Sequence, residues 1–256
     1  QAWAWGSAWS IGAFVLGGAL LVAFVLVERK AAEPVLPLWV FSRRLLVTTT
    51  LISLGVGAIL IGLTSYVPTY LESTIGVPPL VSGLAVAALT LGWPLAASVS
   101  GRFYLRIGFR NTALLGTGIA ILGTIVLAAT SITPSVLYVA VSCFIVGLGM
   151  GLVATPTLIA AQSSVSWSER GVVTGTNMFA RSIGSAVGVA VFGAIANAII
   201  LSASGGAHSP AAVQSASTAV FVSVAVVAVL TIVAGLLMPR SRVEDVELGR
   251  AASVAD

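Results

Sequence analysis

The residues best suited to chemistry form a polar stripe inside one of the chain's long apolar stretches. Their three-or-four spacing places them on one face of a helix, and the stripe consists of Thr174, Asn177, Arg181, Gly184 and Gly188. Arg181 is the only charged residue well inside an apolar stretch. A charge at the centre of a bilayer costs at least about 3 kcal/mol and usually signals function. We therefore expect Arg181 and Asn177 to face the interior of a helix bundle, where a substrate would bind.

The depth of Arg181 has two interpretations. In the first, the side chain lies within the membrane and lines a cavity. In the second, the residue lies at the inner boundary of the membrane and its side chain extends to the interface. Twenty residues separate Arg181 from Leu201, which is about 30 Å of helix and matches the hydrocarbon thickness of a bilayer. Both interpretations point the side chain inward, with the glycines of its stripe.

Aromatic and hydroxyl residues on other apolar stretches are further candidates for a substrate cavity. Tyr66 and Tyr70 are four residues apart, and an aromatic face suits flat, apolar or cationic molecules. Membership of an outer aromatic belt is the alternative for both. Thr64 lies beside them, and Thr155 lies near the inner end of its own stretch. Trp93 is either a packed core residue or a cavity-lining one.

Two prolines inside apolar stretches are candidate hinges. Pro68 frees a backbone carbonyl and can bend its helix, and Pro156 interrupts regular hydrogen bonding in the sequence Thr-Pro-Thr. Gly147, Gly149 and Gly151 lie on the same stretch as Pro156. Their spacing favours close helix packing.

Composition excludes most soluble functions. Only 8% of the residues are charged and 58% are hydrophobic, with a mean hydropathy of +1.09, whereas a soluble domain averages about 25% charged residues. The sequence offers no metal-ligand spacing, nucleophile triad or phosphate loop, and its single cysteine and histidine are Cys143 and His208. We therefore expect a membrane protein that is not an enzyme, with no metal and no bound cofactor. The scattered arginines argue against nucleic acid as a partner.

Apolar stretches long enough to cross a bilayer as helices recur seven times. They run at about 10–28, 45–71, 82–100, 111–130, 134–160, 171–201 and 216–238. They are apolar on every side, unlike the alternating strands of a barrel. The predicted fold is an all-α integral membrane protein with seven transmembrane helices. Its parts are an outer loop, one helix and an interfacial linker over 1–44, a six-helix bundle over 45–238, and a disordered cytoplasmic tail over 239–256.

Along the chain, connectors that carry basic residues alternate with connectors that carry none. Eleven of the twelve Lys and Arg residues fall on one face of the seven-helix path, and none falls on the other. Because cytoplasmic loops carry the excess of Lys and Arg, we expect a multi-pass protein of the cell membrane. Its N-terminus would lie outside and its C-terminus in the cytoplasm.

The densest basic connector is the stretch GRFYLRIGFR, residues 101–110, which we expect to form a short cytoplasmic turn. It resembles a loop motif of the major facilitator superfamily, approximately G-x-L-x-D-R-x-G-R-R. Gly101, Arg106, Gly108 and Arg110 match this motif, Arg102 adds to its charge, and Leu105 replaces the aspartate. The stretches VERKAAEPVLPLWVFSRR and GLGMGLVATPTLIAAQSSVSWSERG resemble elements of fourteen-helix drug–proton antiporters.

The resemblance implies that the last six helices are the C-terminal bundle of a major facilitator fold. In that family the helices at 45–71 and 134–160 face the central cavity, and the loop at 101–110 helps to hold the cytoplasmic side closed. The implied function is the C-terminal half of a proton-coupled multidrug efflux transporter that uses the proton gradient. Its partners would be the lipid bilayer, hydrophobic or cationic small molecules, and a missing N-terminal half.

Proton coupling needs an acid within the membrane, and none is predicted in this chain. The residue that carries the proton, an acid whose pKa is raised by burial, would then belong to the N-terminal half. Alternative functions are a dedicated exporter of one physiological compound, such as an antibiotic, lipid or siderophore, and a non-transporting membrane scaffold subunit.

Overall fold

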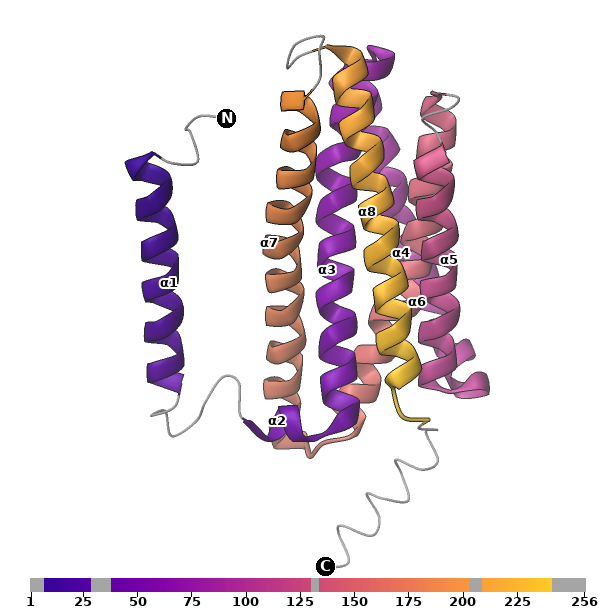
Figure 1. The fold of residues 1–256 in the computed structure, drawn as a ribbon. Coiled ribbons are helices and arrows are strands. Elements are labelled where there is room, and N and C mark those ends of the chain that lie inside the picture. Colours follow the sequence, from indigo (N-terminus) through magenta and orange to yellow (C-terminus); the bar gives the residue numbers. More distant parts are fainter. Residues whose placement is uncertain (1–6, 29–37, 130–133, 203–208, 241–256) are drawn as a thin grey trace, which may run out of the picture.

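The computed structural model describes residues 7–28, 38–129, 134–202 and 209–240, and these residues form helices joined by short connectors (Figure 1). The long helices in chain order are α1 (Ala8–Glu28), α3 (Arg44–Tyr70), α4 (Pro79–Ile107), α5 (Phe109–Ala129), α6 (Val136–Ser163), α7 (Arg170–Ser202) and α8 (Pro210–Leu237). Short elements precede or follow them: α2 (Leu38–Ser42), the π-helix η1 (Leu71–Ile75) and the 3-10 helix η2 (Trp167–Glu169).

Seven helices of the described residues are long and apolar enough to cross a membrane. The predicted all-α membrane fold with seven spanning helices is thereby confirmed. The predicted boundaries for the first, fifth and sixth helices agree with α1, α6 and α7 to within three residues. The last helix starts six residues earlier than predicted, at Pro210. Most of the predicted tail, from residue 241 onward, lies outside the described residues.

Helices α3 and α6 form the centre of the six-helix bundle. Their most apolar segments are 61% and 56% buried, compared with 28% and 22% for α4 and α7. Helix α3 packs against α7 and α8, whereas α6 packs against α4 and α5, and α5 and α8 contact each other. The two halves of the bundle, α3–α5 and α6–α8, therefore repeat one packing scheme.

Glycines bring the helix pairs of both halves into close contact. A Cβ added at Gly57 of α3 would collide with the carbonyl of Arg181 on α7, and one at Gly184 would collide with the carbonyl of Leu54. In the other half, a Cβ at Gly147 of α6 would collide with the carbonyl of Leu89 on α4. Because the missing side chains let backbone meet backbone, these glycines fix where Arg181 sits against α3.

Helix α1 stands apart from this bundle (Figure 1). Its most apolar segment is entirely unburied. The ring of Phe24 stacks on Phe179 of α7 with 5.9 Å between centroids. The linker to α2 at residues 29–37 lies outside the described residues. Within α2, Val40 is buried against Leu46 and Val173, at the start of α3 and α7.

The predicted cytoplasmic turn at 101–110 is shorter than expected. Helix α4 continues through Ile107, and α5 starts at Phe109, so Gly108 alone separates them. Gly108 has a φ of 83°, a left-handed conformation that glycine adopts without the steric cost of a side chain. The arginines of the motif are good helix formers, so the helix persists until the one residue that can reverse its direction.

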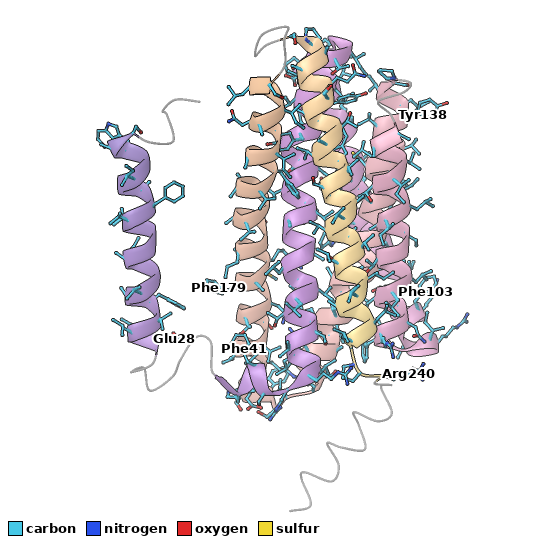
Figure 2. All side chains as sticks on the ribbon, viewed as in Figure 1. Glu28, Phe41, Phe103, Tyr138, Phe179 and Arg240 are labelled. Carbon is cyan, nitrogen blue, oxygen red and sulfur yellow. The ribbon has the colours of Figure 1, made fainter. Side chains whose placement is uncertain are left out.

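The described arginines, apart from Arg181, gather at one end of the bundle (Figure 2). They lie at the start of α3, around the α4–α5 turn, at the start of α7 and after α8, and they are Arg43, Arg44, Arg102, Arg106, Arg110, Arg170 and Arg240. We refer to this as the arginine-bearing end. Among the described residues, the charged group at the opposite end is Glu72 in η1, which accepts a hydrogen bond of 2.5 Å from Ser82.

Candidate functional site

Arg181 and Trp93 form the central contact of the candidate site. Arg181 lies eleven residues into α7, about 16 Å along the helix. Trp93 is the middle residue of α4, with fourteen residues on either side. The guanidinium carbon of Arg181 lies 5.4 Å from the centre of the Trp93 ring, within the range of a cation–π attraction. The structure thus joins two residues that the sequence predicts separately.

The charge of Arg181 has no carboxylate partner within the described part of the chain. Its Nε atom is buried and has no hydrogen-bond partner there. The described acids are Glu28, Glu72 and Glu169, and each lies at a helix end or in a short connecting helix. The Trp93 ring is the group that the structure places over the guanidinium. A half-buried cation without a carboxylate partner is costly, so packing alone gives no reason for an arginine at this position.

Hydrogen bonds between helices hold α7 in place around this contact. The hydroxyl of Ser53 on α3 donates to the side-chain oxygen of Asn177 over 2.7 Å, and the Asn177 amide donates to the carbonyl of Val173. Asn177 is only 5% exposed. Nearer the arginine-bearing end, the amide of Gln162 on α6 donates to Thr174 over 2.8 Å. Asn177, predicted as a cavity residue, therefore lies inside the α3–α7 contact.

Ser185 adds a further link between α7 and α3, because its hydroxyl donates to the carbonyl of Gly57 over 3.1 Å. It lies one helical turn beyond Arg181. The bonds from Asn177 and Ser185 bracket Arg181 on both sides along α7. The backbone of Arg181 is consequently fixed, while its side chain extends toward α4.

The two tyrosines of α3 differ in their surroundings. Tyr70 is fully buried and meets Phe221 of α8 edge to face, with 5.6 Å between ring centres. Tyr66 is half-buried, and its hydroxyl lies close to Gly193 of α7. Thr64 is exposed and donates its hydroxyl to the carbonyl of Leu60 in its own helix. The structure therefore places Tyr70 in the core and leaves Tyr66 and Thr64 partly or fully accessible.

The remaining predicted residues lie on α6 and α3. Thr155 is half-buried, and the neighbouring Pro156 is buried inside a continuous helix. Pro68 is likewise inside α3, three residues before that helix passes into the π-helix η1. The loss of one backbone donor at a proline accounts for such irregular turns. The two hinge candidates therefore lie at opposite ends of the bundle.

The motif at the α4–α5 turn is held together by aromatic stacking. Tyr104 stacks on Phe109 with 4.9 Å between ring centres, and the Gly108 amide donates to the carbonyl of Tyr104 over 3.0 Å. Arg102 and Arg106 are exposed, whereas the Nε of Arg110 is buried without a partner among the described residues. Gly101 lies in the helix. The motif is therefore a rigid corner and not a flexible loop.

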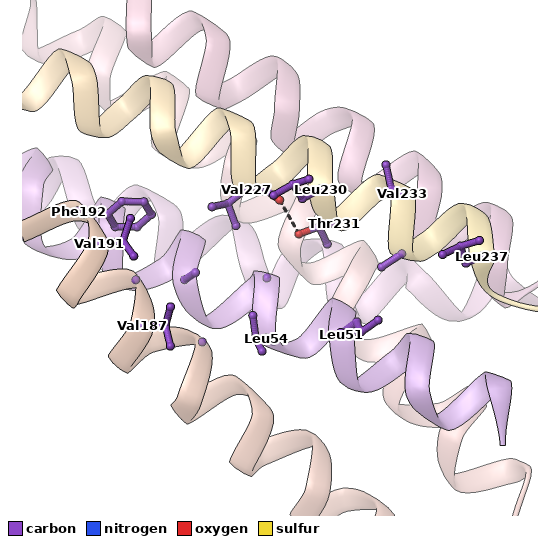
Figure 3. A pocket seen from close by; sticks show the side chains of 15 residues that line it. Leu51, Leu54, Val187, Val191, Phe192, Val227, Leu230, Thr231, Val233 and Leu237 are labelled. Carbon is purple, nitrogen blue, oxygen red and sulfur yellow. Dashed lines mark hydrogen bonds between the residues drawn. The ribbon is translucent and has the colours of Figure 1, made fainter. Parts of the chain in front are cut away.

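A groove between α3, α7 and α8 was not predicted from the sequence (Figure 3). Fifteen residues line a volume of about 350 Å³, and Thr231 is the only polar one. We call it the lateral groove. None of the predicted cavity residues lines it. Its sequence signal is weak, because it arises where small residues of three distant segments, such as Gly55, Gly188 and Ala234, happen to align.

The sequence of this chain is similar to a known protein family and to several membrane transporters. The family model described as Major Facilitator Superfamily matches residues 1–189. The multidrug transporter protein MdtP of Bacillus subtilis is 32% identical over 196 residues, which are 77% of this chain and 36% of that protein. Multidrug resistance protein 3 of the same organism is 27% identical over 191 residues, which are 75% of this chain and 37% of that protein.

A third relative is a tetracycline resistance determinant of Streptomyces rimosus. It is 30% identical over 203 residues, which are 78% of this chain and 58% of that protein. The aligned part of the chain thus spans between about a third and somewhat over half of the length of these relatives. The long apolar helices, the paired packing of α3 with α7 and α6 with α4, and the match to the family model agree: the chain is a multi-pass membrane protein that belongs to the major facilitator superfamily.

Proposed function

We propose that this chain forms the C-terminal part of a proton-coupled multidrug efflux transporter that works by alternating access. Relatives named as multidrug transporters and as a tetracycline resistance determinant align with the same segment. Transporters of this superfamily bind substrate near the midplane, between two halves that rock against each other. The bundle α3–α8 would supply one of those halves, and the other would come from an N-terminal half.

The observation that carries the proposal is the contact between Arg181 and Trp93. It places an unpaired cation and an aromatic face together, near the middle of α4 and away from the arginine-bearing end. This supports the interpretation in which Arg181 acts within the membrane over the one in which it extends to the interface. Trp93 and the half-buried Tyr66 offer aromatic faces to hydrophobic or cationic substrates.

The energy source and the orientation complete the proposal. The arginine-bearing end would face the cytoplasm, because short loops rich in arginine stay on that side. Protons would move inward as substrate moves out. The described helices contain no acid in their central turns, so the proton-carrying residue would belong to the N-terminal half. Arg102, Arg106 and Arg110 would help to hold the cytoplasmic side closed.

A second candidate is export of one physiological compound that carries an acidic group. Arg181 favours it, because the guanidinium has no carboxylate partner among the described residues and binds carboxylates strongly. In that case an acidic group of the substrate would pair with the Arg181 guanidinium beside Trp93. The charge of the dyes that are transported separates the two candidates.

The test is transport by the full-length protein in inverted vesicles with an imposed pH gradient. Several hydrophobic dyes, cationic and anionic, are compared in the wild type, Arg181→Ala and Tyr66→Ala. Val226→Ala serves as a matched control, because Val226 is exposed on α8, away from α4 and the Arg181 contact. We expect gradient-driven uptake of several unrelated dyes, and at least one dye whose uptake falls in Arg181→Ala and not in the control.

Each alternative has its own outcome. Uptake that ignores the gradient contradicts proton coupling. Uptake of anionic dyes alone, lost in Arg181→Ala, favours the dedicated exporter of an acidic compound. The absence of transport for every compound favours the scaffold function. If neither substitution changes any dye, Arg181 and Tyr66 do not contribute to the site.

A further inference from the structure

The lining of the lateral groove is almost entirely apolar, so the groove suits a hydrocarbon chain. Its one polar residue, Thr231, donates its hydroxyl to the carbonyl of Val227 in its own helix over 2.8 Å (Figure 3). The groove therefore presents no unsatisfied polar group. A polar ligand would lose hydrogen bonds to water there without replacing them, whereas an apolar chain would lose none.

The length of the groove corresponds to one leaflet of a bilayer. On α8 its lining extends from Val227 to Leu237, a separation of ten positions and therefore about 15 Å of helix. The hydrocarbon core of a bilayer is about 30 Å thick, so one leaflet contributes about half of that. Figure 3 shows the lining side chains spread along the helices from Phe192 at one end to Leu237 at the other.

The groove ends beside two arginines. The Nε of Arg44 donates to the carbonyl of Leu237 over 2.9 Å, and Leu237 lines the groove. This bond fixes the guanidinium at the mouth of the groove. Arg240 follows Leu237 by three residues and is exposed. Neither arginine forms an ion pair within the residues that the structure describes, so both are available to an anion.

We propose that the lateral groove binds an anionic phospholipid from the leaflet at the arginine-bearing end. One acyl chain lies along α3, α7 and α8, and the phosphate lies at Arg44 and Arg240. The length of the groove, its apolar lining and the position of the two cations together match this ligand. With the orientation proposed above, the leaflet is the cytoplasmic one, which carries the negative surface potential.

Protein is the competing occupant of the groove: helix α1, a second copy of the chain, or the N-terminal half proposed above. Helix α1 touches α7 through Phe24 and Phe179, and Phe179 does not line the groove. The lipid test can be separated from the transport test, because Arg44 and Val233 take no part in the contact between Arg181 and Trp93.

Fluorescence quenching by brominated lipids tests the proposal. In the full-length protein with its cysteines replaced, Val233→Cys places a fluorescent label in the groove and Val226→Cys places one outside it; both valines are exposed on α8. The labelled proteins are reconstituted in vesicles with small fractions of brominated phosphatidylglycerol or brominated phosphatidylcholine. The measurement is repeated with Arg44→Gln and with Arg102→Gln, an exposed arginine away from the groove.

We expect phosphatidylglycerol to quench the V233C label at a concentration at least about fivefold lower than phosphatidylcholine, the preference that one arginine near an anionic lipid supplies. Arg44→Gln should reduce this preference by a factor of about five, whereas Arg102→Gln should leave it unchanged. The V226C label should show no preference between the two lipids. Equal quenching by both lipids at V233C would overturn the proposal, as would a preference that Arg44→Gln leaves unchanged. Quenching at V226C with none at V233C would show that protein, and not lipid, covers the groove.

Discussion

Gly184→Ala is the substitution that the geometry of α7 opposes most strongly. The added methyl group would overlap the carbonyl oxygen and carbonyl carbon of Leu54 on α3. These are backbone atoms, so no side-chain rotation can make room. The two helices would have to separate along the contact that also holds the backbone of Arg181 against Gly57.

The size of the effect follows from comparison with Gly175, nine residues earlier on the same helix. A Cβ at Gly175 would meet nothing within 4 Å, so Gly175→Ala gains helix propensity of up to about 1 kcal/mol. Overpacking in a close-packed interior costs about 1–3 kcal/mol or more, and a backbone collision belongs at the upper end of that range. We therefore expect the two alanine variants to differ by about 3–4 kcal/mol in stability.

The assay is thermal unfolding of the purified protein in one detergent, with the wild type and both variants measured side by side. Gly184→Ala should lower the midpoint by at least about 5 °C, since about 1 kcal/mol corresponds to 2–4 °C in a chain of this size. Gly175→Ala should leave it unchanged or raise it. Equal midpoints for the two variants would refute the close contact between α3 and α7.

Two further predictions concern the links around the site and the α4–α5 corner. Ser53→Ala leaves the buried oxygen of Asn177 without its donor and should destabilise the protein by about 1–3 kcal/mol, whereas Ser98→Ala, at an exposed residue bonded within its own helix, should have little effect in the same thermal assay. Gly108→Ala forces a side chain into a backbone conformation, φ 83° and ψ 163°, that is essentially restricted to glycine, and it should lower stability by about 1–3 kcal/mol. Gly101→Ala, at a helical residue with no neighbouring atom closer than 3.8 Å, should not, and equal midpoints for the two would contradict the corner.

Much of the fold is predictable because lipid imposes strict rules on sequence. A helix of about 20 apolar residues is needed for each crossing, and loop arginines mark one side, so helix number and the clustering of the arginines follow from counting. The end of α4 is harder to predict. The sequence from Gly101 to Ile107 is compatible with both helix and turn, and the left-handed conformation at Gly108 decides between them.

The candidate site is only partly predictable, because its contacts depend on residues far apart in sequence. Arg181 is conspicuous by its charge alone. Its partner Trp93 lies 88 positions away and is brought to it by the packing of α4 and α7 around α3 and α6. The burial of Tyr70 depends on Phe221, and that of Asn177 on Ser53. No local pattern reports such neighbours. The lateral groove is equally hard to predict, because it depends on the packing of three segments that are distant in sequence.

The central claim is a path of alternating membrane crossings that keeps the arginine-bearing end in the cytoplasm. Single cysteines at Ser73 in η1 and Ser168 in η2, both exposed, test it in intact cells with a membrane-impermeant thiol reagent, in a variant that lacks the buried Cys143. The account predicts that Ser73→Cys reacts in intact cells and that Ser168→Cys reacts only after the membrane is permeabilised. Reaction of both, or of neither, in intact cells would contradict it.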